Sequence, residues 1–443
     1  MGLNWAPTPL DPAARVPGHE HTAGRRARLS ARFPGVRLIV PAGRVAVRSN
    51  DCDFRFRPHS AYAWLTGLTD ETQADHVLVL EPDGPGHQAV LHVRPRSPRG
   101  PGQDAFFRDR RHGELWVGRR PDVDEVESLT GIRCVPLTDG TAGAGAGTGT
   151  DPTRAPGLLL GRDPELDAAL AELRLIKDAW ELARLQEAVD HTTTGFTDMV
   201  RALPTALAHR RGERWLEGVF DLRARAEGNG TGYETIAASG AHACVLHWTR
   251  NDGRLDPADL LLFDAGVEVD TLHTADITRT LPLSGRFSPV QRRVYELVLA
   301  AQQAGIDALR PGVEFREFHR ACMAVITEGL VDWGMLKHAD GDLHRRYTLC
   351  GSGHMLGLDV HDCAKARAST YTAGPLAEGH VLTVEPGLYF QPDDETLPPE
   401  LRGIGVRIED DLVITAEGAH LMSSALPRTP DAVETWMATL RED

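Results

Sequence analysis

The chain has 443 residues, of which 41% are hydrophobic and 25% are charged. This length predicts about two or three domains, and the composition excludes a wholly disordered chain. Lys and Arg number 48 against 63 Asp and Glu, so the net charge is −15. Such an acidic balance argues against nucleic-acid binding and against adsorption to an anionic membrane, because both need a basic face.

Marks of export and membrane insertion are not evident in the sequence. The first residues contain no apolar core of signal-peptide length, and no apolar run approaches the roughly 20 residues of a membrane-spanning helix. The six cysteines are scattered and include no Cys-x-x-Cys pair, which fits neither a zinc finger nor a dense disulfide framework. We therefore expect a cytoplasmic protein.

In chain order, the first third alternates between helical and β-like segments. Residues 19–33 form a basic amphipathic stretch that predicts a helix, and short apolar runs at 37–40, 77–80 and 89–93 predict strands. Turn residues separate the runs, such as Pro-Asp-Gly at 82–84. This alternation is typical of a small α/β domain.

A segment rich in Gly and Ala follows at 139–157, and it cannot build a core, so we expect a flexible loop or linker there. A helical pattern then opens with the capping box Asp178-x-x-Glu181, and we place the domain boundary near residue 172. Beyond the boundary, predicted helices alternate with β-like segments. The expected helices cover 177–202, 211–227, 288–309 and 315–334, and the expected strands cover 260–266, 276–282, 381–390 and 404–415.

Acidic residues within β-like apolar runs indicate the chemistry. Asp264 follows an apolar run, the same situation recurs at Asp276, Glu385 and Glu409, and His354 lies among glycines and aliphatic residues. A buried carboxylate is costly unless it has a partner, so these side chains point to a shared divalent metal site. Their oxygens favour hard or borderline cations. Because the set is larger than one tetrahedral ion needs, two metals that share carboxylates are the simplest interpretation.

Strand alternation adds Arg407 to this set. Arg407 and Glu409 are two positions apart, so they point to one face of a strand, while Val406 and Ile408 point to the other. The guanidinium of Arg407 would then hydrogen-bond a ligating carboxylate and orient it. The alternative for Arg407 is a plain salt bridge.

Seven stretches of the chain resemble the aminopeptidase P and prolidase group of metallopeptidases, which have the pita-bread fold. The resemblance is strong over about 172–425 and extends into the N-terminal part, where it points to aminopeptidase P. The stretches are GYETIAASGAHACVLHWTRND (232–252), DAG…DITRT (264–280), HMLGLDVHD (354–362), TVEPGLY (383–389), GIGVRIEDD (403–411), RSNDCDFRFRPHSAYAWLTGL (48–68) and ELWVGRRPD (114–122).

The resemblance implies an α/β (α+β) protein with a small creatinase/RNase H-like N-terminal domain over 1–172 and a catalytic pita-bread metallopeptidase domain over 173–443. It implies a hydrolase, a metallo-aminopeptidase that cleaves the N-terminal Xaa-Pro bond of peptides by attack of a metal-bridging hydroxide on the carbonyl. The implied cofactors are two divalent ions per chain, with Mn²⁺ expected first and Co²⁺ or Zn²⁺ as alternatives. The expected partners are peptides with proline in second position and further copies of the chain in a homodimer or homotetramer.

The resemblance also assigns the metal ligands. Asp264 would bind one metal, and Asp276 and Glu409 would bridge both. His354 and Glu385 would bind the second metal, and Glu385 would also take the proton of the attacking water.

Five further residues complete the implied site. His247 and His361 would line the substrate site and either stabilise the oxyanion or move protons. Arg407 would support the ligands, and Tyr233 would lie close to them. Trp116 is a separate hypothesis: it would contribute to substrate binding, in the site of a neighbouring subunit, and the alternative is a core residue.

The sequence departs from the family pattern at three places. Cys350 stands where His or Ala is usual, and Ser352 stands where Thr or an aliphatic residue is usual. The spacing from Asp264 to Asp276 is one residue longer than the common form, and the extra residue falls in an expected hairpin turn at 267–275. No departure removes a ligand.

Two alternatives to an aminopeptidase P stay open. A prolidase would cleave only Xaa-Pro dipeptides. A metal-free binding protein with the same fold would typically have lost some ligands, whereas this sequence keeps all five.

Overall fold

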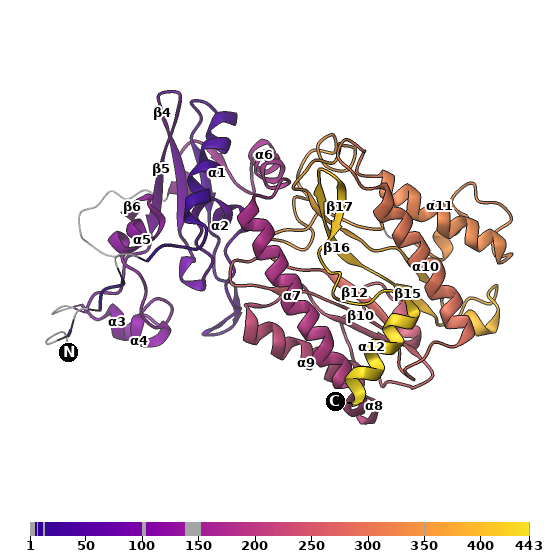
Figure 1. Ribbon diagram of the computed structural model, residues 1–443. Coiled ribbons are helices and arrows are strands. Elements are labelled where there is room, and N and C mark those ends of the chain that lie inside the picture. The colour runs from indigo at the N-terminus through magenta and orange to yellow at the C-terminus, as the bar shows by residue number, and fades with distance from the viewer. Residues whose placement is uncertain are drawn as a thin grey trace. The chain divides into compact units, whose positions relative to one another are not determined.

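The computed structural model describes residues 5–6, 8–11, 14–99, 103–137, 152–349 and 351–442 (Figure 1). These residues form two compact units, and the boundary between the units in the sequence lies after Leu173. Within the described ranges, none of the helices has the length and apolar character needed to cross a lipid bilayer.

The first unit is built on a mixed sheet of five strands. The strands are β1 (Leu38–Pro41), β4 (Val77–Asp83), β5 (Gly86–Val93), β6 (Arg133–Pro136) and β7 (Leu158–Leu159). Their order in the sheet is β6-β5-β4-β1-β7. Strand β4 pairs antiparallel with β1 and β5, whereas β6 and β7 run parallel to their neighbours at the edges. A short hairpin of β2 (Val47–Ser49) and β3 (Cys52–Asp53) lies outside this sheet.

Among the described residues of the first unit, six α-helices lie wholly or mainly within it. They are α1 (His19–Arg32), α2 (Ser60–Thr66), α3 (Ala105–Arg108), α4 (Glu114–Val117), α5 (Val123–Thr130) and α6 (Pro164–Arg174). The predicted helix at 19–33 is confirmed as α1, and the three predicted strands are confirmed as β1, β4 and β5. Of the predicted linker, residues 139–151 lie outside the described residues, and Pro152–Arg154 form a short 3₁₀ helix.

The second unit contains two three-stranded antiparallel sheets and two smaller strand pairs. The first sheet has the order β12-β10-β9, and the second has the order β13-β16-β17. The strands are β8 (Gly230–Thr231), β9 (Ile236–Ser239), β10 (Leu260–Ala265), β11 (Val267–Glu268), β12 (Ile277–Pro282), β13 (Val381–Val384), β14 (Gly387–Tyr389), β15 (Gly405–Arg407), β16 (Asp410–Thr415) and β17 (Gly418–Leu421). Strand β8 pairs with β11, and β14 pairs with β15.

Two pairs of helices flank the strands of the second unit. The α-helices described in this unit are α7 (Ala179–Arg201), α8 (Leu203–Ala208), α9 (Gly212–Glu227), α10 (Pro289–Ala308), α11 (Glu317–Asp332) and α12 (Pro430–Glu442). Helix α7 packs on α9 and α10 packs on α11, and strands β10, β12 and β15 lie between these pairs in Figure 1. All four predicted helices are confirmed. The capping box is also present, since Asp178 accepts from the N–H of Glu181 at 3.0 Å and Glu181 accepts in return at 3.1 Å.

Two predicted strands are broken, and each break contains a candidate ligand. The prediction of one strand over 381–390 is wrong, because β13 and β14 are separated by Glu385 and Pro386. The prediction over 404–415 is wrong in the same way, because β15 ends before Glu409 and β16 begins after it. Proline lacks the N–H that a ladder needs, which explains the first break.

The extra residue between Asp264 and Asp276 lies in a turn, as expected. The N–H of Val269 donates to the carbonyl of His273 at 3.0 Å, and Leu272 has a left-handed φ of 69°. The predicted hairpin turn is therefore confirmed, and it returns the chain to β12 in register with β10.

Candidate active site

Asp264 and Asp276 lie on one face of the β12-β10-β9 sheet. Asp264 in β10 is directly opposite Thr278 in β12, and Asp276 is the residue before β12 begins. Because side chains alternate along a strand, Asp276 and Thr278 point to the same face. Two buried carboxylates are thereby brought side by side.

The two strand breaks add Glu409 and Glu385. The hydroxyl of Thr278 donates to Glu409 Oε2 at 2.7 Å, and the N–H of Glu409 donates to the carbonyl of Thr278 at 3.1 Å. The N–H of Glu385 donates to the carbonyl of Ser352 at 2.9 Å. These bonds fix one glutamate against β12 and the other against the loop that carries His354.

His354 faces this group of carboxylates. Its Nε2 lies 3.2 Å from Asp276 Oδ2 and 3.5 Å from Glu385 Oε1. Its Nδ1 lies 3.2 Å from the carbonyl oxygen of Met355, so the other ring nitrogen is directed at the carboxylates. One ligand atom each from Asp276, His354 and Glu409 lie within 4.8 Å of one another, which suits a shared metal ion.

The electrostatics of this cluster favour a bound cation. Burial and then the charge of Asp276 raise the pKa of Glu409 well above its ordinary value, and burial raises the pKa of Glu385 to about 7. Burial works to lower the pKa of His354, but the hydrogen bond to Asp276 and the charge of Glu385 outweigh it and raise the pKa to about 9. A cation would remove the mutual repulsion of the carboxylates.

Two buried carboxylate oxygens bear on whether these residues can bind a metal ion. Asp264 Oδ1 and Glu409 Oε1 are shielded from solvent and have no hydrogen-bond partner. Leaving a buried carboxylate oxygen unsatisfied is costly. Several carboxylates with one imidazole form a donor set that suits Mn²⁺, Co²⁺ or Zn²⁺. The residues therefore fit divalent metal binding.

Arg407 determines which oxygen of Asp264 is left for a cation. Its Nη2 donates to Asp264 Oδ2 at 2.5 Å, and its Nε donates to Thr278 Oγ1 at 3.2 Å. A third bond runs from Nη1 to the hydroxyl of Tyr389 at 3.0 Å. Arg407 is buried, and this arrangement engages Oδ2 of Asp264 while its Oδ1 has no hydrogen-bond partner.

A cavity of about 690 Å³ opens over the cluster. The structure brings nine of the ten predicted site residues to its wall, namely Tyr233, His247, Asp264, Asp276, His354, His361, Glu385, Arg407 and Glu409. The ring of His361 meets that of His354 edge to face, with 4.5 Å between the ring centroids. Burial, followed by the charge of Asp264, raises the pKa of the Tyr233 phenol well above its ordinary value.

Trp116 is the one predicted residue that this cavity does not include. It belongs to α4 in the first unit, where its side chain is 53% exposed and its Nε1 donates to the carbonyl of Phe107 at 2.8 Å. It lines a separate cavity of about 590 Å³ together with Phe54 and Arg120. Its role in substrate binding stays a prediction.

Sequence reasoning missed several residues in the wall of the main cavity. Glu234 adds an exposed carboxylate next to Tyr233, and Thr249 adds a hydroxyl. Ile236, Leu246 and Val360 supply apolar surface. The available signal was their place in the same short motifs as the predicted histidines, within three positions of residues already selected.

The two departures within the His354 loop differ in what the structure describes. Ser352 has a left-handed φ of 56°, and its hydroxyl lies 3.0 Å from Nδ1 of His319 on α11. Its carbonyl still accepts from Glu385, so the change of side chain leaves this contact intact. Cys350 lies outside the described residues.

Gly266, two positions after Asp264, allows a close approach that a side chain would prevent. A Cβ at this position would lie 1.7 Å from the carbonyl oxygen of Ala275 and 3.1 Å from the ring of Tyr233. We expect Gly266→Ala to lower the free energy of unfolding by about 1–3 kcal/mol, the usual range for overpacking. Urea denaturation would measure it. Gly218→Ala on α9 meets nothing within 4 Å and serves as the control, since it should cause no loss of stability.

Comparisons with known proteins define the class of protein. Residues 183–416 match the family described as metallopeptidase family M24, and residues 22–142 match the family described as aminopeptidase P, N-terminal domain. The chain belongs to metallopeptidase family M24, in the aminopeptidase P group. It is therefore a metallo-aminopeptidase with a pita-bread catalytic domain, as the resemblance implied.

Individual relatives cover nearly the whole chain. Xaa-Pro aminopeptidase 1 of Streptomyces coelicolor is 49% identical, over 100% of this chain and 91% of the relative. Xaa-Pro aminopeptidase 2 of the same organism is 50% identical, over 99% of this chain and 95% of the relative. The solved structure of Escherichia coli aminopeptidase P with the inhibitor Pro-Leu superposes with a TM-score of 0.79 at 28% identity, over 96% of this chain and 99% of that one.

Proposed function

We propose that this protein hydrolyses the bond between the N-terminal residue of a peptide and a proline in second position, with two divalent metal ions in the cluster. The observation that carries the proposal is the set of buried ligand-type side chains with two unsatisfied carboxylate oxygens beneath a peptide-sized cavity. Xaa-Pro specificity is supported by two relatives that are named Xaa-Pro aminopeptidases and are 49% and 50% identical to this chain.

The proposed ligand roles are those that the family resemblance implies. Asp264 would bind one metal, and Asp276 and Glu409 would bridge both. His354 and Glu385 would bind the second. When bound, the two cations lower the pKa of a water molecule and polarise the carbonyl of the substrate. The short distances among Asp276, His354 and Glu409 support shared ligation.

The chain's own residues handle protons and orientation. Glu385 accepts a proton from the attacking water and delivers it to the proline nitrogen, which has no N–H in the peptide and must gain a proton to leave. His247 and His361, on the cavity wall, donate to the oxygen of the tetrahedral intermediate. Arg407 holds Asp264 in one orientation through the bond at 2.5 Å.

Other features of the proposal concern the whole protein. The N-terminal domain covers 1–172 and the catalytic domain 173–443, which is supported by the boundary after Leu173. Mn²⁺ is the proposed metal, and the cytoplasm is the proposed location. The proposed assembly is a homodimer or homotetramer in which Trp116 reaches the site of a neighbouring subunit, consistent with its 53% exposure.

A direct assay tests the proposed function. The protein is loaded with Mn²⁺ and offered Ala-Pro-Pro and Ala-Pro, and released alanine is measured. We expect cleavage of the tripeptide and a loss of at least about a hundredfold in Asp276→Asn, because a loss of about 3 kcal/mol of transition-state stabilisation corresponds to that factor. Cleavage of the dipeptide alone would make the protein a prolidase. No cleavage, with two ions bound per chain, would overturn the proposed substrate.

A further inference from the structure

Glu213 on α9 is a fully buried carboxylate outside the metal cluster. It accepts four hydrogen bonds. Oε1 accepts from the N–H of Ser239 at 2.9 Å and lies 2.7 Å from Nδ1 of His242. Oε2 accepts from Nε1 of Trp248 at 2.9 Å and from the N–H of Gly253 at 2.7 Å. Every one of these donors belongs to a single segment, residues 239–253, which we call the His247 loop.

The His247 loop has little regular structure of its own. It begins at Ser239, the last residue of β9, and its only helix is the short 3₁₀ helix Gly240–Cys244. Glu213 binds the loop at both ends and twice in the middle. His247 lies between these contacts, beside Trp248, with an exposed side chain on the wall of the metal-site cavity.

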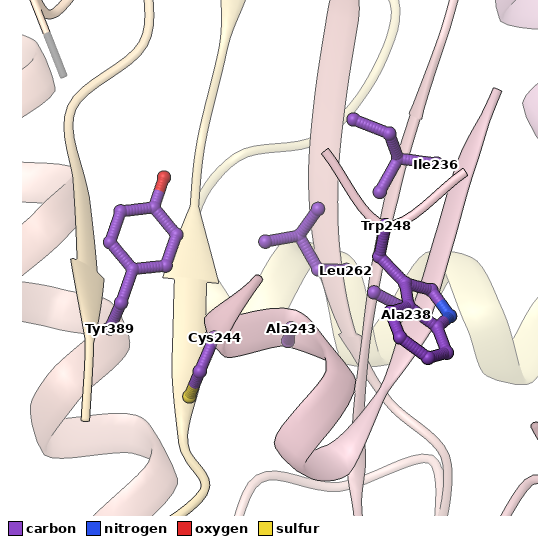
Figure 2. Packing of buried hydrophobic residues seen from close by; sticks show 7 residues of the cluster. All are labelled: Ile236, Ala238, Ala243, Cys244, Trp248, Leu262 and Tyr389. Atoms are coloured by element: carbon purple, nitrogen blue, oxygen red, sulfur yellow. The ribbon is translucent and has the colours of Figure 1, made fainter. Parts of the chain in front are cut away.

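Packing around Trp248 couples this anchor to the site. Figure 2 shows Trp248, Ala243 and Cys244 of the loop with Ile236, Ala238, Leu262 and Tyr389, which form one buried cluster. The ring of His242 stacks on Trp248 with 3.8 Å between centroids. At Gly253 the approach of Glu213 is so close that a Cβ would lie 2.6 Å from Oε2.

We propose that Glu213 is a positioning residue that holds His247 in place through the Trp248 and Gly253 contacts. This inference rests on the role of His247 in the proposed function. A carboxylate suits the position because both of its oxygens accept and neither donates, which matches four N–H donors. A glutamine would keep the shape but would turn its amide N–H groups toward two of those donors and leave them unsatisfied.

A double-mutant cycle separates positioning from a general effect on the fold. In the Mn²⁺-loaded enzyme with Ala-Pro-Pro, we expect Glu213→Gln to lower kcat by about 10–100-fold, as loss of outer contacts does at metal sites, with KM and Mn²⁺ affinity within about twofold. In a His247→Ala background the same change should lower kcat by less than about twofold, because the two residues act as a unit. Multiplicative losses in the two backgrounds would overturn the inference.

A second readout does not depend on catalysis. Amide hydrogen exchange followed by mass spectrometry should show faster exchange in Glu213→Gln for peptides within 239–253 and unchanged exchange in β12 and α10. Unchanged exchange in the loop would overturn the inference even if the wild type failed to cleave, whereas failure of the wild type alone would overturn only the proposed function.

Two more variants serve as controls, one for misfolding of Glu213→Gln and one for unspecific effects of losing a carboxylate. Trp248→Phe removes the indole donor but keeps a ring in the cluster, so it should reproduce part of the loss if Glu213→Gln does not fold. Glu227→Gln removes a carboxylate at the end of the same helix, where it pairs with Arg223. It should leave kcat and loop exchange within about twofold of the wild type.

Discussion

Glu409→Gln is expected to have opposite effects on activity and on the stability of the metal-free protein. In the Mn²⁺-loaded protein, losing this proposed bridging ligand should lower kcat/KM at least about 1000-fold, since metal ions contribute several kcal/mol to the transition state. In the metal-free protein, the same substitution should raise the free energy of unfolding by about 1–3 kcal/mol. Urea denaturation after chelation, with and without added Mn²⁺, measures both states of the protein.

The gain in the metal-free protein follows from the direction of the pKa shift. Burial and neighbouring carboxylates raise the pKa of Glu409 in the folded state above its value in the unfolded state. At neutral pH this difference lowers the free energy of unfolding of the metal-free protein. One pKa unit corresponds to about 1.4 kcal/mol. Because the folded pKa is the higher one, this penalty is present at neutral pH and disappears as the pH falls below the unfolded value of about 4.3.

The stabilisation gained on metal binding should differ between the wild type and Glu409→Gln. A metal that binds only the folded state stabilises it by about 2.7 kcal/mol at a hundredfold excess over Kd, and the variant should lose most of that increment. Glu417→Gln, at an exposed turn, is the control and should change neither quantity. A metal-free Glu409→Gln protein that is clearly less stable than the wild type would contradict the view of the cluster as a set of mutually repelling carboxylates.

Sequence patterns predicted the helices of the second unit better than the ends of its strands. The helix of Asp178 and Glu181 could be placed because its start signal is local. The break at Glu385 also had a local signal, the proline that follows it. The break at Glu409 had none, because its backbone N–H bonds to Thr278, which is 131 positions away in the sequence. A pairing of that kind is set by the tertiary fold.

The same distinction applies to the candidate site. Asp276, His354 and Arg407 each lie in a short recognisable stretch, so they could be selected from the sequence, and the structure places them around one cavity. Glu213 could not be selected. It lies on an ordinary amphipathic helix, and its four donors are between 26 and 40 positions away. Its burial is visible only in the folded chain.

A second large effect on stability is expected at Asp362, which follows His361. Its carboxylate pairs with two buried, positively charged side chains. Its Oδ1 accepts a close bond from Arg174, and its Oδ2 lies 3.1 Å from Nζ of Lys177. Arg174 also donates to the partly exposed Asp359 at 2.8 Å. Asp362→Asn should lower the free energy of unfolding at pH 7 by about 3–5 kcal/mol, because it leaves buried positive charge uncompensated.

The matched control and the pH dependence make this prediction specific. Asp359 pairs with the same arginine, but its side chain is 42% exposed, so Asp359→Asn should cost less than about 1 kcal/mol.

Burial alone would raise the pKa of Asp362, but Arg174 and Lys177 outweigh it and hold the pKa well below its usual value. A lowered folded pKa means that the stabilisation is complete above the unfolded value of about 3.9 and is lost as the pH falls toward the folded one. The gap between the urea midpoints of the wild type and Asp362→Asn should therefore shrink progressively as the pH falls below about 4. A gap that stayed constant would show that charge pairing is not the cause.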